Sequence, residues 1–357
     1  MRYVTAGTAK PISKIGLGTW QFGSPEWNYG QRYAGEQARA IVRRAIDLGI
    51  TLFDTAEIYG MQGRSVACRA LVRGLSLRDP AAIRGFGHGE RILGEALEDR
   101  GDAAFVATKF YPAVPFAAAP RQRAAASADR LGIGQIDLCQ VHRPRNPAGQ
   151  SAAIRAARAL HTEGIVGEVG LSNGSLDDWR AAESALGARV LSNQLPYSLV
   201  NRSAEDGMLP FAETRGRVII AHSPLARGLL SCRYDAANRP GNPARMADPL
   251  FLPENLARAG GLFAALREVA DAHSATPAQI ALAWVIRHEA VAAIPGAASV
   301  TQLESNAEAA DITLAGDECL ALESAAARFR PVLRGRPVRC RDPKTLVVSN
   351  TKGRGSC

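Results

Sequence analysis

The feature that most constrains the fold is a series of short apolar segments, each followed by a stretch with helical periodicity. Eight such segments occur in order, at residues 15–20, 51–55, 103–109, 136–142, 167–172, 190–194, 218–223 and 291–296. Their length and β-branched content are typical of strands buried on both faces of a parallel sheet. Amphipathic stretches such as 36–49, 177–187 and 277–289 lie between them. This alternation predicts an α/β fold, a single-domain (β/α)8 TIM barrel.

An open, doubly wound sheet is the alternative architecture. That form usually carries a G-x-G-x-x-G turn after its first strand when it binds a dinucleotide, and no such turn occurs here. Two segments depart from the alternation: residues 61–87, where a short loop would suffice, and the Pro-, Gly- and Arg-rich residues 331–357. We therefore expect a barrel over residues 1–330, interrupted by an insertion at about 61–87 and followed by a flexible basic tail.

Composition places the chain in the globular class, with 46% hydrophobic and 22% charged residues. No apolar run approaches the roughly 20 residues that cross a bilayer, and the first residues lack an apolar leader, so a cytoplasmic protein without membrane contact is expected. The six cysteines are scattered, without a C-x-x-C pair, which predicts neither a disulfide framework nor a metal site.

The formal net charge of +9 is localised. Nine Lys or Arg and one acid lie between Arg328 and the end of the chain, and five Arg and one Asp lie between Met61 and His88. The remainder is mildly acidic. A localised basic tail is usually a solvated chain end, so no nucleic-acid partner is expected.

Four polar residues lie where predicted strands end or just beyond. Asp54 ends the second segment, Tyr59 follows it, Lys109 ends the third and His142 ends the fourth. Each alone has an ordinary structural explanation, such as a helix cap or a core histidine. A barrel, however, brings all of its strand-to-helix loops together at the carboxyl ends of the strands, where catalytic residues lie.

These four side chains suit carbonyl reduction. A hydride delivered to a carbonyl carbon leaves an alkoxide that needs a proton, and a tyrosine with a reference pKa of about 10 is a weak acid at neutral pH. A neighbouring ammonium stabilises the phenolate, and a carboxylate keeps that ammonium in place and charged. The histidine can polarise the carbonyl oxygen or relay the proton. No metal is required.

Several segments resemble the signature motifs of the aldo-keto reductase family. They are GLGTW (16–20), FDTAEIYG (53–60), ATK (107–109), DLCQVHRP (137–144), GLSN (170–173), SNQLPYS (192–198), HSPLARGLL (222–230) and IPGAAS with QLESN (294–306). The resemblance runs from about residue 3 to 330, apart from 61–87. It implies an oxidoreductase that transfers hydride from NADP(H) to the aldehyde or ketone group of a small molecule.

The resemblance also implies roles for individual residues. Asp54, Tyr59, Lys109 and His142 would form the catalytic tetrad. Ser172, Asn173 and Gln194 would bind the nicotinamide carboxamide, for which amide side chains offer both a donor and an acceptor, and Tyr197 would stack on the ring. The other implied cofactor contacts are Gly18 and Thr19 near the ribose, Trp20 and Asp54, then Ser223, Pro224, Leu225 and Gly228 along the pyrophosphate, and Gly296, Ala297, Gln302 and Asn306 at the adenosine end.

The sequence departs from the family pattern after Gly296. Many family members carry Lys or Arg there to bind the 2′-phosphate that distinguishes NADP from NAD. Here the residues are Ala297, Ala298 and Ser299, which bring no charge. NADP(H) is the expected cofactor, and NAD(H) remains open.

Two other readings remain. One is a cofactor-binding regulatory subunit resembling the β subunits of potassium channels, which the complete tetrad disfavours. The other is a barrel lyase or isomerase acting on phosphorylated sugars, which would leave Gln194 and Tyr197 unexplained. Aromatic residues near the first and third strand ends suggest an apolar substrate pocket, although they also suit the core: Trp20, Trp27, Tyr29 and Phe110. The insertion is expected to be tolerated by the barrel, with a lid over the substrate as the alternative.

Overall fold

The computed structural model describes residues 1–24, 27, 31–60, 86–110, 120–142 and 147–332. Each of the eight predicted segments overlaps one strand of a single parallel sheet, in which neighbouring strands follow chain order from β3 to β10. The strands of this sheet are β3 (Leu17–Gly18), β4 (Leu52–Asp54), β5 (Phe105–Phe110), β6 (Ile136–His142), β7 (Val166–Ser172), β8 (Ser192–Pro196), β9 (Val218–His222) and β10 (Val291–Ala293).

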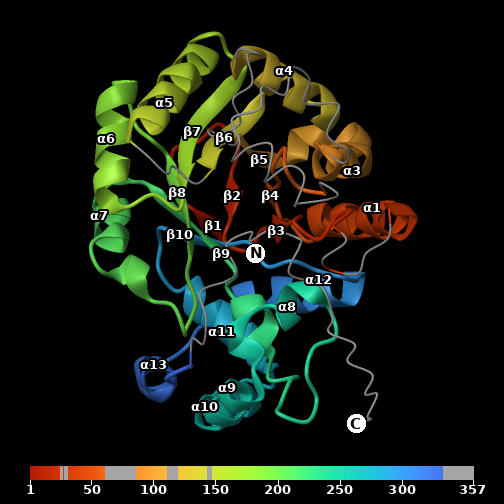
Figure 1. Ribbon diagram of the computed structural model, residues 1–357, viewed down its shortest axis with the longest axis vertical. Coiled ribbons are helices and arrows are strands. Elements are labelled where there is room, and N and C mark those ends of the chain that lie inside the picture. Colours follow the sequence, from red (N-terminus) through yellow and green to blue (C-terminus); the bar gives the residue numbers. More distant parts are fainter. Residues whose placement is uncertain (25–26, 28–30, 61–85, 111–119, 143–146, 333–357) are drawn as a thin grey trace, which may run out of the picture.

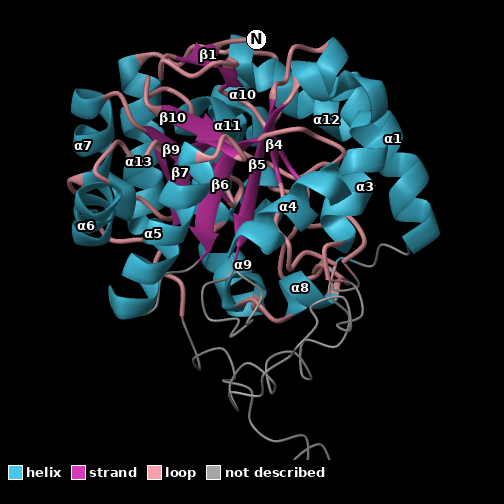
Figure 2. Ribbon diagram, turned by 90° about the horizontal axis from the view of Figure 1, so that it is seen from above, coloured by secondary structure: helices cyan, strands magenta, loops and turns pink. Residues whose placement is uncertain are grey.

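The sheet closes on itself. A parallel bridge joins Ile15, just before β3, to Ala293 in β10. The backbone N–H of Gly16 donates to the carbonyl of Ala293 at 2.7 Å, and that of Gly18 donates to the carbonyl of Pro295 at 3.1 Å. The predicted (β/α)8 barrel is therefore confirmed, with strands at the centre and helices around them (Figures 1 and 2).

Helices form the outer layer. They are α1 (Gln31–Asp47), α3 (His88–Leu97), α4 (Pro120–Leu131), α5 (Pro147–Thr162), α6 (Leu176–Leu186), α7 (Met208–Arg215), α8 (Pro243–Met246), α9 (Pro253–Arg258), α10 (Gly260–Ala272), α11 (Pro277–Val285), α12 (Val300–Glu308) and α13 (Gly316–Arg328). Local signals explain several boundaries. The Ser175 hydroxyl and the Asp178 carboxylate form a capping box at the start of α6, and Gly187 ends that helix in a left-handed conformation.

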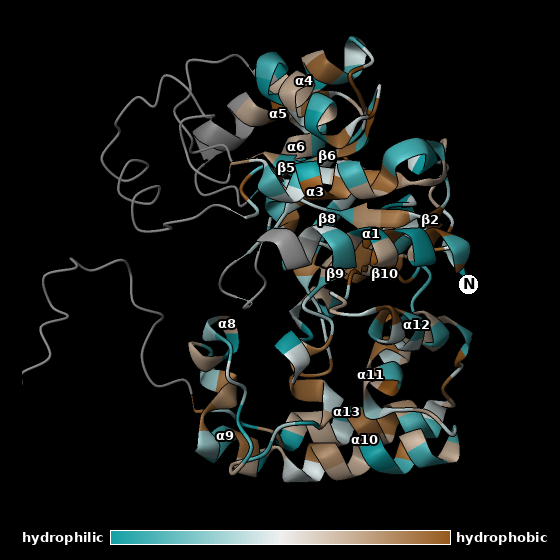
Figure 3. Cartoon of the chain, turned by 90° about the vertical axis from the view of Figure 1, so that its right-hand side faces the viewer, coloured by the Kyte–Doolittle hydropathy of each residue, from teal (hydrophilic) through white to brown (hydrophobic). Residues whose placement is uncertain are grey.

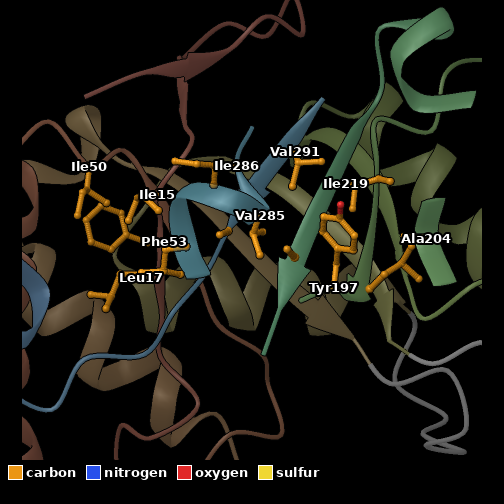
Figure 4. Packing of buried hydrophobic residues seen from close by; sticks show 14 of the residues in the cluster. Ile15, Leu17, Ile50, Phe53, Tyr197, Ala204, Ile219, Val285, Ile286 and Val291 are labelled. Atoms are coloured by element: carbon orange, nitrogen blue, oxygen red, sulfur yellow. The ribbon is translucent and has the colours of Figure 1, made fainter. Parts of the chain in front are cut away.

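Two apolar layers hold the barrel together. The inner layer fills the barrel with side chains such as Leu52, Phe105, Leu138 and Ile220. The outer layer packs the other face of each strand against the helices; Figure 4 shows part of it. Because successive strand residues point to opposite faces, alternate residues of one strand enter alternate layers.

A short hairpin covers the amino-terminal end of the barrel. Strands β1 (Tyr3–Val4) and β2 (Ile12–Ser13) pair in antiparallel fashion, and Val4 and Ile12 pack with the inner layer. The sequence analysis did not predict this hairpin. Helices α10 and α13 pack together outside the barrel strands (Figure 3).

Most of the predicted insertion and of the basic tail lies outside the described residues. The expectations of a tolerated insertion and of a flexible tail therefore remain predictions. Two residues at the end of the insertion, Phe86 and Gly87, are described and buried. Val332, at the start of the tail, exchanges hydrogen bonds with the Asn255 side chain at 2.7 and 3.0 Å. In the described ranges, no helix has the length and apolarity needed to cross a membrane.

Candidate active site

A buried lysine lies at the centre of the candidate active site. Lys109, near the end of β5, is 1% exposed, and its Nζ donates to the two carboxylate oxygens of Asp54 at 2.7 and 2.8 Å. The same nitrogen donates to the carbonyl of Thr55 at 2.8 Å and to the hydroxyl oxygen of Tyr59 at 3.2 Å. Three of the four predicted catalytic side chains therefore meet in one hydrogen-bonded cluster.

The electrostatics of this cluster keep the lysine charged. Burial by itself would lower the pKa of Lys109, but the Asp54 carboxylate, the Tyr59 phenol and their hydrogen bonds raise the pKa of Lys109 above its ordinary value. An ammonium therefore lies beside the Tyr59 hydroxyl, where it stabilises a phenolate more than a neutral phenol.

The loop that carries Tyr59 is held by the start of α3. The N–H of Gly89 donates to the carbonyl of Tyr59 at 3.0 Å. A side chain at Gly89 would place its Cβ 2.9 Å from the Cβ of Tyr59, so this close approach requires glycine. The position of the phenol is thus fixed from the backbone as well as from Lys109.

Two of the aromatic residues predicted to line a substrate pocket, Trp20 and Trp27, form an aromatic wall, in which Trp20 lies beside Tyr59. The Trp20 ring is stacked on the Tyr59 ring, with centroids 6.5 Å apart, and Trp27 meets Trp20 edge-on at 5.3 Å. Phe110 instead lies under the guanidinium of Arg123, 5.7 Å from its ring centroid. Tyr29 is outside the described residues.

His142 occupies the last position of β6 and is 8% exposed. In the sheet register it is paired with Ser172 of β7, which is in turn paired with Gln194 of β8. The barrel therefore brings His142 and two predicted carboxamide ligands to one level of its carboxyl end, on the strands that follow β5.

Gln194 extends the charged cluster. It is 2% exposed, and its Nε2 donates to Asp54 Oδ2 at 2.7 Å and to Gln140 Oε1 at 3.4 Å. Gln140 Nε2 also lies 3.4 Å from Asp54 Oδ2. Two side-chain amides thus help to orient the carboxylate that holds Lys109.

Ser172 and Asn173 form a second polar group. Asn173 Nδ2 donates to Ser172 Oγ at 2.9 Å, and Asn173 has a positive φ of 63°, which is uncommon for a residue other than glycine. Its Oδ1 lies 3.1 Å from Nε2 of His222, and the other ring nitrogen of His222 lies 3.2 Å from Ser223 Oγ. This group spans the ends of β7 and β9.

The structure contradicts the expected role of Tyr197. This side chain is 1% exposed; its ring packs on Trp284 with centroids 5.4 Å apart, and its hydroxyl donates to Glu205 at 2.8 Å. Figure 4 shows Tyr197 among the hydrophobic residues of the outer layer. The reason is the alternation of β8: Gln194 points into the barrel, so a residue three positions later points outward. The ring has no face open to a nicotinamide.

His222 is the residue that the sequence analysis missed. It follows Val218 and Ile220 at steps of two in β9, and both of these belong to the inner layer, so the half-buried imidazole faces the carboxyl mouth of the barrel. The same alternation was readable in the sequence VIIAHS. It would have favoured His222 over Tyr197 as the ring beside the cofactor.

The predicted ribose contacts lie next to Asp54. Thr19 is buried, and both its N–H and its hydroxyl donate to the carbonyl of Asp54 at 2.9 Å. At Gly18 an added Cβ would lie 2.7 Å from the carbonyl oxygen of Ile294, so glycine is required where β3 approaches the end of β10.

The loop after β9 contains the predicted pyrophosphate contacts, which are Ser223, Pro224, Leu225 and Gly228. Its backbone is unusual, because Ser223, Ala226, Arg227 and Gly228 all have φ between 47° and 101°. Arg227 lies over the Trp20 ring at 5.9 Å and pairs with Asp248 at 3.1 Å. The loop thereby reaches the aromatic wall beside Tyr59.

The predicted adenosine contacts surround the start of α12. Ser299 caps this helix by accepting from the N–H of Gln302, and Gln302 Oε1 accepts from the N–H of Ala298 at 2.7 Å. Asn306 Nδ2 donates to the carbonyl of Gly296 at 3.4 Å. Gln302 and Asn306 thus shape the turn that leads into the helix, and Ala297 is buried beneath it.

Within the described ranges, no group of three His, Cys, Asp or Glu side chains is arranged to hold a metal ion. The described site consists of a lysine–carboxylate–phenol cluster, a histidine, and a helix start suited to anions. Backbone N–H groups at a helix start bind phosphates readily.

Comparison with known proteins agrees with this geometry. The model of the aldo/keto reductase family matches residues 14–327. The chain is 47% identical over 336 residues to an uncharacterized oxidoreductase of Mycobacterium bovis, covering 94% of this chain and 96% of that protein. It is 28% identical over 315 residues to the methylglyoxal reductase of Escherichia coli, covering 88% and 91% of the two chains. An aldo/keto reductase of Klebsiella pneumoniae solved with NADP and acetate is 27% identical, with a TM-score of 0.66 over 94% of this chain and 98% of that one.

The closed parallel barrel, with a buried Lys–Asp–Tyr cluster at the carboxyl ends of its strands, defines a (β/α)8-barrel oxidoreductase. The chain belongs to the aldo/keto reductase family.

Proposed function

We propose that the protein reduces aldehyde or ketone groups of small molecules to alcohols with NADPH, and that Tyr59 is the general acid. The observation that carries this proposal is the position of Lys109 Nζ, which is 3.2 Å from the Tyr59 hydroxyl while bound to both oxygens of Asp54. That arrangement lowers the cost of forming a phenolate, which is what proton donation by tyrosine requires.

We assign a separate role in the reaction to each of four side chains. Tyr59 donates its hydroxyl proton to the substrate oxygen as negative charge develops there. Lys109 stabilises the phenolate that remains, and Asp54 keeps Lys109 charged and in place. His142, at the neighbouring strand end, donates a hydrogen bond to the same substrate oxygen and orients the carbonyl. Bound NADPH supplies the hydride.

The residues present fit a nicotinamide dinucleotide. Ser172 and Asn173 carry the donors and acceptors that a carboxamide needs, and His222 provides a ring at the mouth of the barrel in place of Tyr197. The start of α12 offers backbone donors to phosphate. The Klebsiella pneumoniae relative was solved with NADP, which favours this cofactor. The uncharged Ala297, Ala298 and Ser299 keep NADH as an alternative.

The substrate class follows from the aromatic wall. Trp20 borders Tyr59 and Trp27 packs on Trp20, and this apolar surface favours small aldehydes and ketones with an apolar or aromatic body. The relative in Escherichia coli is a methylglyoxal reductase, so a small dicarbonyl belongs in the test panel.

The experiment is NADPH and NADH oxidation by the purified protein, with aldehydes, ketones, methylglyoxal and sugars as substrates. Turnover of aldehydes or ketones that is lost in Tyr59→Phe supports the proposal. A protein that binds NADPH tightly yet turns over none of these compounds would instead match the regulatory-subunit alternative.

A further inference from the structure

A largely buried ion pair joins the loop that carries Tyr59 to α4. Glu57, two residues before Tyr59, has a side chain that is 1% exposed; that of Arg123, near the start of α4, is 10% exposed. Arg123 Nε donates to Glu57 Oε2 at 3.2 Å, and Arg123 Nη2 donates to the other carboxylate oxygen. The contact is bidentate, the geometry that holds two groups most firmly in orientation.

The backbone of Glu57 is held on both sides as well. Its N–H donates to the carbonyl of Lys109 at 3.2 Å, and its carbonyl accepts from the N–H of Gly87 at 2.6 Å. Glu57 therefore connects the end of β5, the start of α3 and the side chain of Arg123. Its position sets the path of the chain that leads to Tyr59.

Arg123 also contacts the residue next to Lys109. Its guanidinium lies 5.7 Å from the ring centroid of Phe110, the residue that follows Lys109. The ion pair thus joins the loop of Tyr59 to the strand end of Lys109. It makes this link although Glu57 and Arg123 are far apart in the sequence.

We infer that Glu57 and Arg123 are positioning residues that fix the distance between the Tyr59 hydroxyl and Lys109 Nζ. The inference rests on the proposed role of Tyr59 as the acid. Charge interaction in a buried site changes steeply with separation, and a displacement of about 1 Å can cost about a hundredfold in rate. The pair acts through Tyr59 and Lys109 and not on the substrate itself.

The sign of a pKa change separates positioning from a direct effect of charge. Through space, loss of the Glu57 charge would lower the phenol pKa, and loss of the Arg123 charge would raise it. If the pair fixes the Tyr59–Lys109 distance, either loss moves the ammonium away from the phenol. Both losses then raise the phenol pKa.

The test uses Glu57→Gln, Arg123→Met and the double variant. Tyr59 ionisation is followed by ultraviolet difference titration against Tyr59→Phe in each background, and kcat is measured against pH. We expect a higher Tyr59 pKa in both single variants and a kcat lowered about tenfold or more. The double variant should resemble the more affected single variant. KM and the Kd of NADPH should stay within about twofold.

A partly buried ion pair far from the strands' carboxyl ends provides the control. Arg217 Nε lies 2.6 Å from Glu183, and both side chains are 15% exposed. This pair joins α6 to the chain just before β9, at the amino-terminal end of the strands. Glu183→Gln and Arg217→Met should lower the melting temperature and leave the Tyr59 pKa and kcat unchanged.

Two results would overturn the inference. Opposite pKa shifts in the two single variants would mean that the charges act through space. A lowered melting temperature with an unchanged Tyr59 pKa and kcat would mean that the pair only stabilises the fold. Because the titration needs no turnover, it gives an answer even if the wild type reduces no carbonyl compound. Failure of the proposed reaction is therefore distinguishable from failure of the positioning role.

Discussion

Lys109 Nζ lies 3.2 Å from the hydroxyl oxygen of Tyr59 and is almost fully buried. An ammonium at this distance in a poorly solvated site is a strong perturbation of a phenol, because little water is present to screen it. The consequences of this contact can be measured directly.

Removal of the Tyr59 hydroxyl should abolish most of the activity. Tyr59→Phe keeps the ring against Trp20 and should leave cofactor binding nearly unchanged, while kcat falls by roughly 10²–10⁴ because the proton donor is lost. Lys109→Met should lower kcat by a comparable factor. The combined variant should be little worse than either, since the two residues act as one unit. Steady-state kinetics and NADPH titration check this, and near-normal turnover by Tyr59→Phe would refute the assignment.

The cofactor preference should be modest and easily changed. Ala298 lies just before α12, where its N–H donates to Gln302, and no charged residue accompanies it between Gly296 and Ser299. Ala298→Arg should strengthen NADPH binding by about 1–3 kcal/mol through a charge-assisted contact to the 2′-phosphate. Binding of both cofactors is measured by fluorescence titration. Equal gains for NADPH and NADH would show that the 2′-phosphate lies elsewhere.

His222, and not Tyr197, should be the ring that the nicotinamide contacts. His222→Ala should weaken NADPH and NADH alike by roughly 1 kcal/mol, and His222→Phe should restore binding, because the contact is with the face of a ring. Tyr197→Leu removes a ring from the outer layer, so it should lower the melting temperature and leave cofactor Kd unchanged. The reverse pattern, with Tyr197 controlling Kd, would reinstate the original expectation.

Acid should destabilise the protein partly through His88. Its imidazole packs against Gly23 and Gly60, and Nε2 is buried without a hydrogen-bond partner in the described part of the chain. Burial, with a smaller contribution from Arg91, lowers the pKa of His88 below its ordinary value of 6.5, while Glu95 opposes this. The folded state thus favours the neutral ring. The stability gained from keeping His88 neutral is complete above the pKa of His88 in the unfolded chain. It is lost as pH falls from there toward the lower pKa of His88 in the folded protein.

The comparison for His88 is the melting temperature of the wild type and of His88→Leu, measured between about pH 7.5 and pH 5.5. The melting temperature of the variant should fall less on acidification than that of the wild type, because the variant has no imidazole at position 88 to protonate. Equal decreases in melting temperature in the two proteins would exclude His88 as a source of the acid sensitivity.

The fold was predictable because each barrel strand and its helix carry local periodicity. The β1–β2 hairpin was not, since strands of two residues are too short to show alternation. Asp54, Lys109 and His142 could be identified because they end apolar segments, where barrel geometry converges. That the Lys109 side chain meets both Asp54 and Tyr59 depends on distances that no spacing in the sequence gives.

The error at Tyr197 and the omission of Glu57 have different causes. At Tyr197 the strand alternation was available and was outweighed by the resemblance of the motif. Glu57 and Arg123, in contrast, are 66 positions apart and carry no shared pattern, so their contact appears only once α4 has packed against the barrel. Long-range ion pairs of this kind are set by tertiary structure alone.

The backbone hydrogen bonds from Gly87 to Glu57 and from Gly89 to Tyr59 have a consequence for how this site can evolve. They hold together the two points at which the chain leaves and re-enters the barrel around residues 61–85, next to Tyr59. Because loop closure costs only about 0.6 kcal/mol per doubling of length, we expect that segments of very different size can be exchanged there while Tyr59 stays in place. We therefore expect that new substrate preferences or an added binding segment can evolve there without changes to the Lys109–Tyr59 contact.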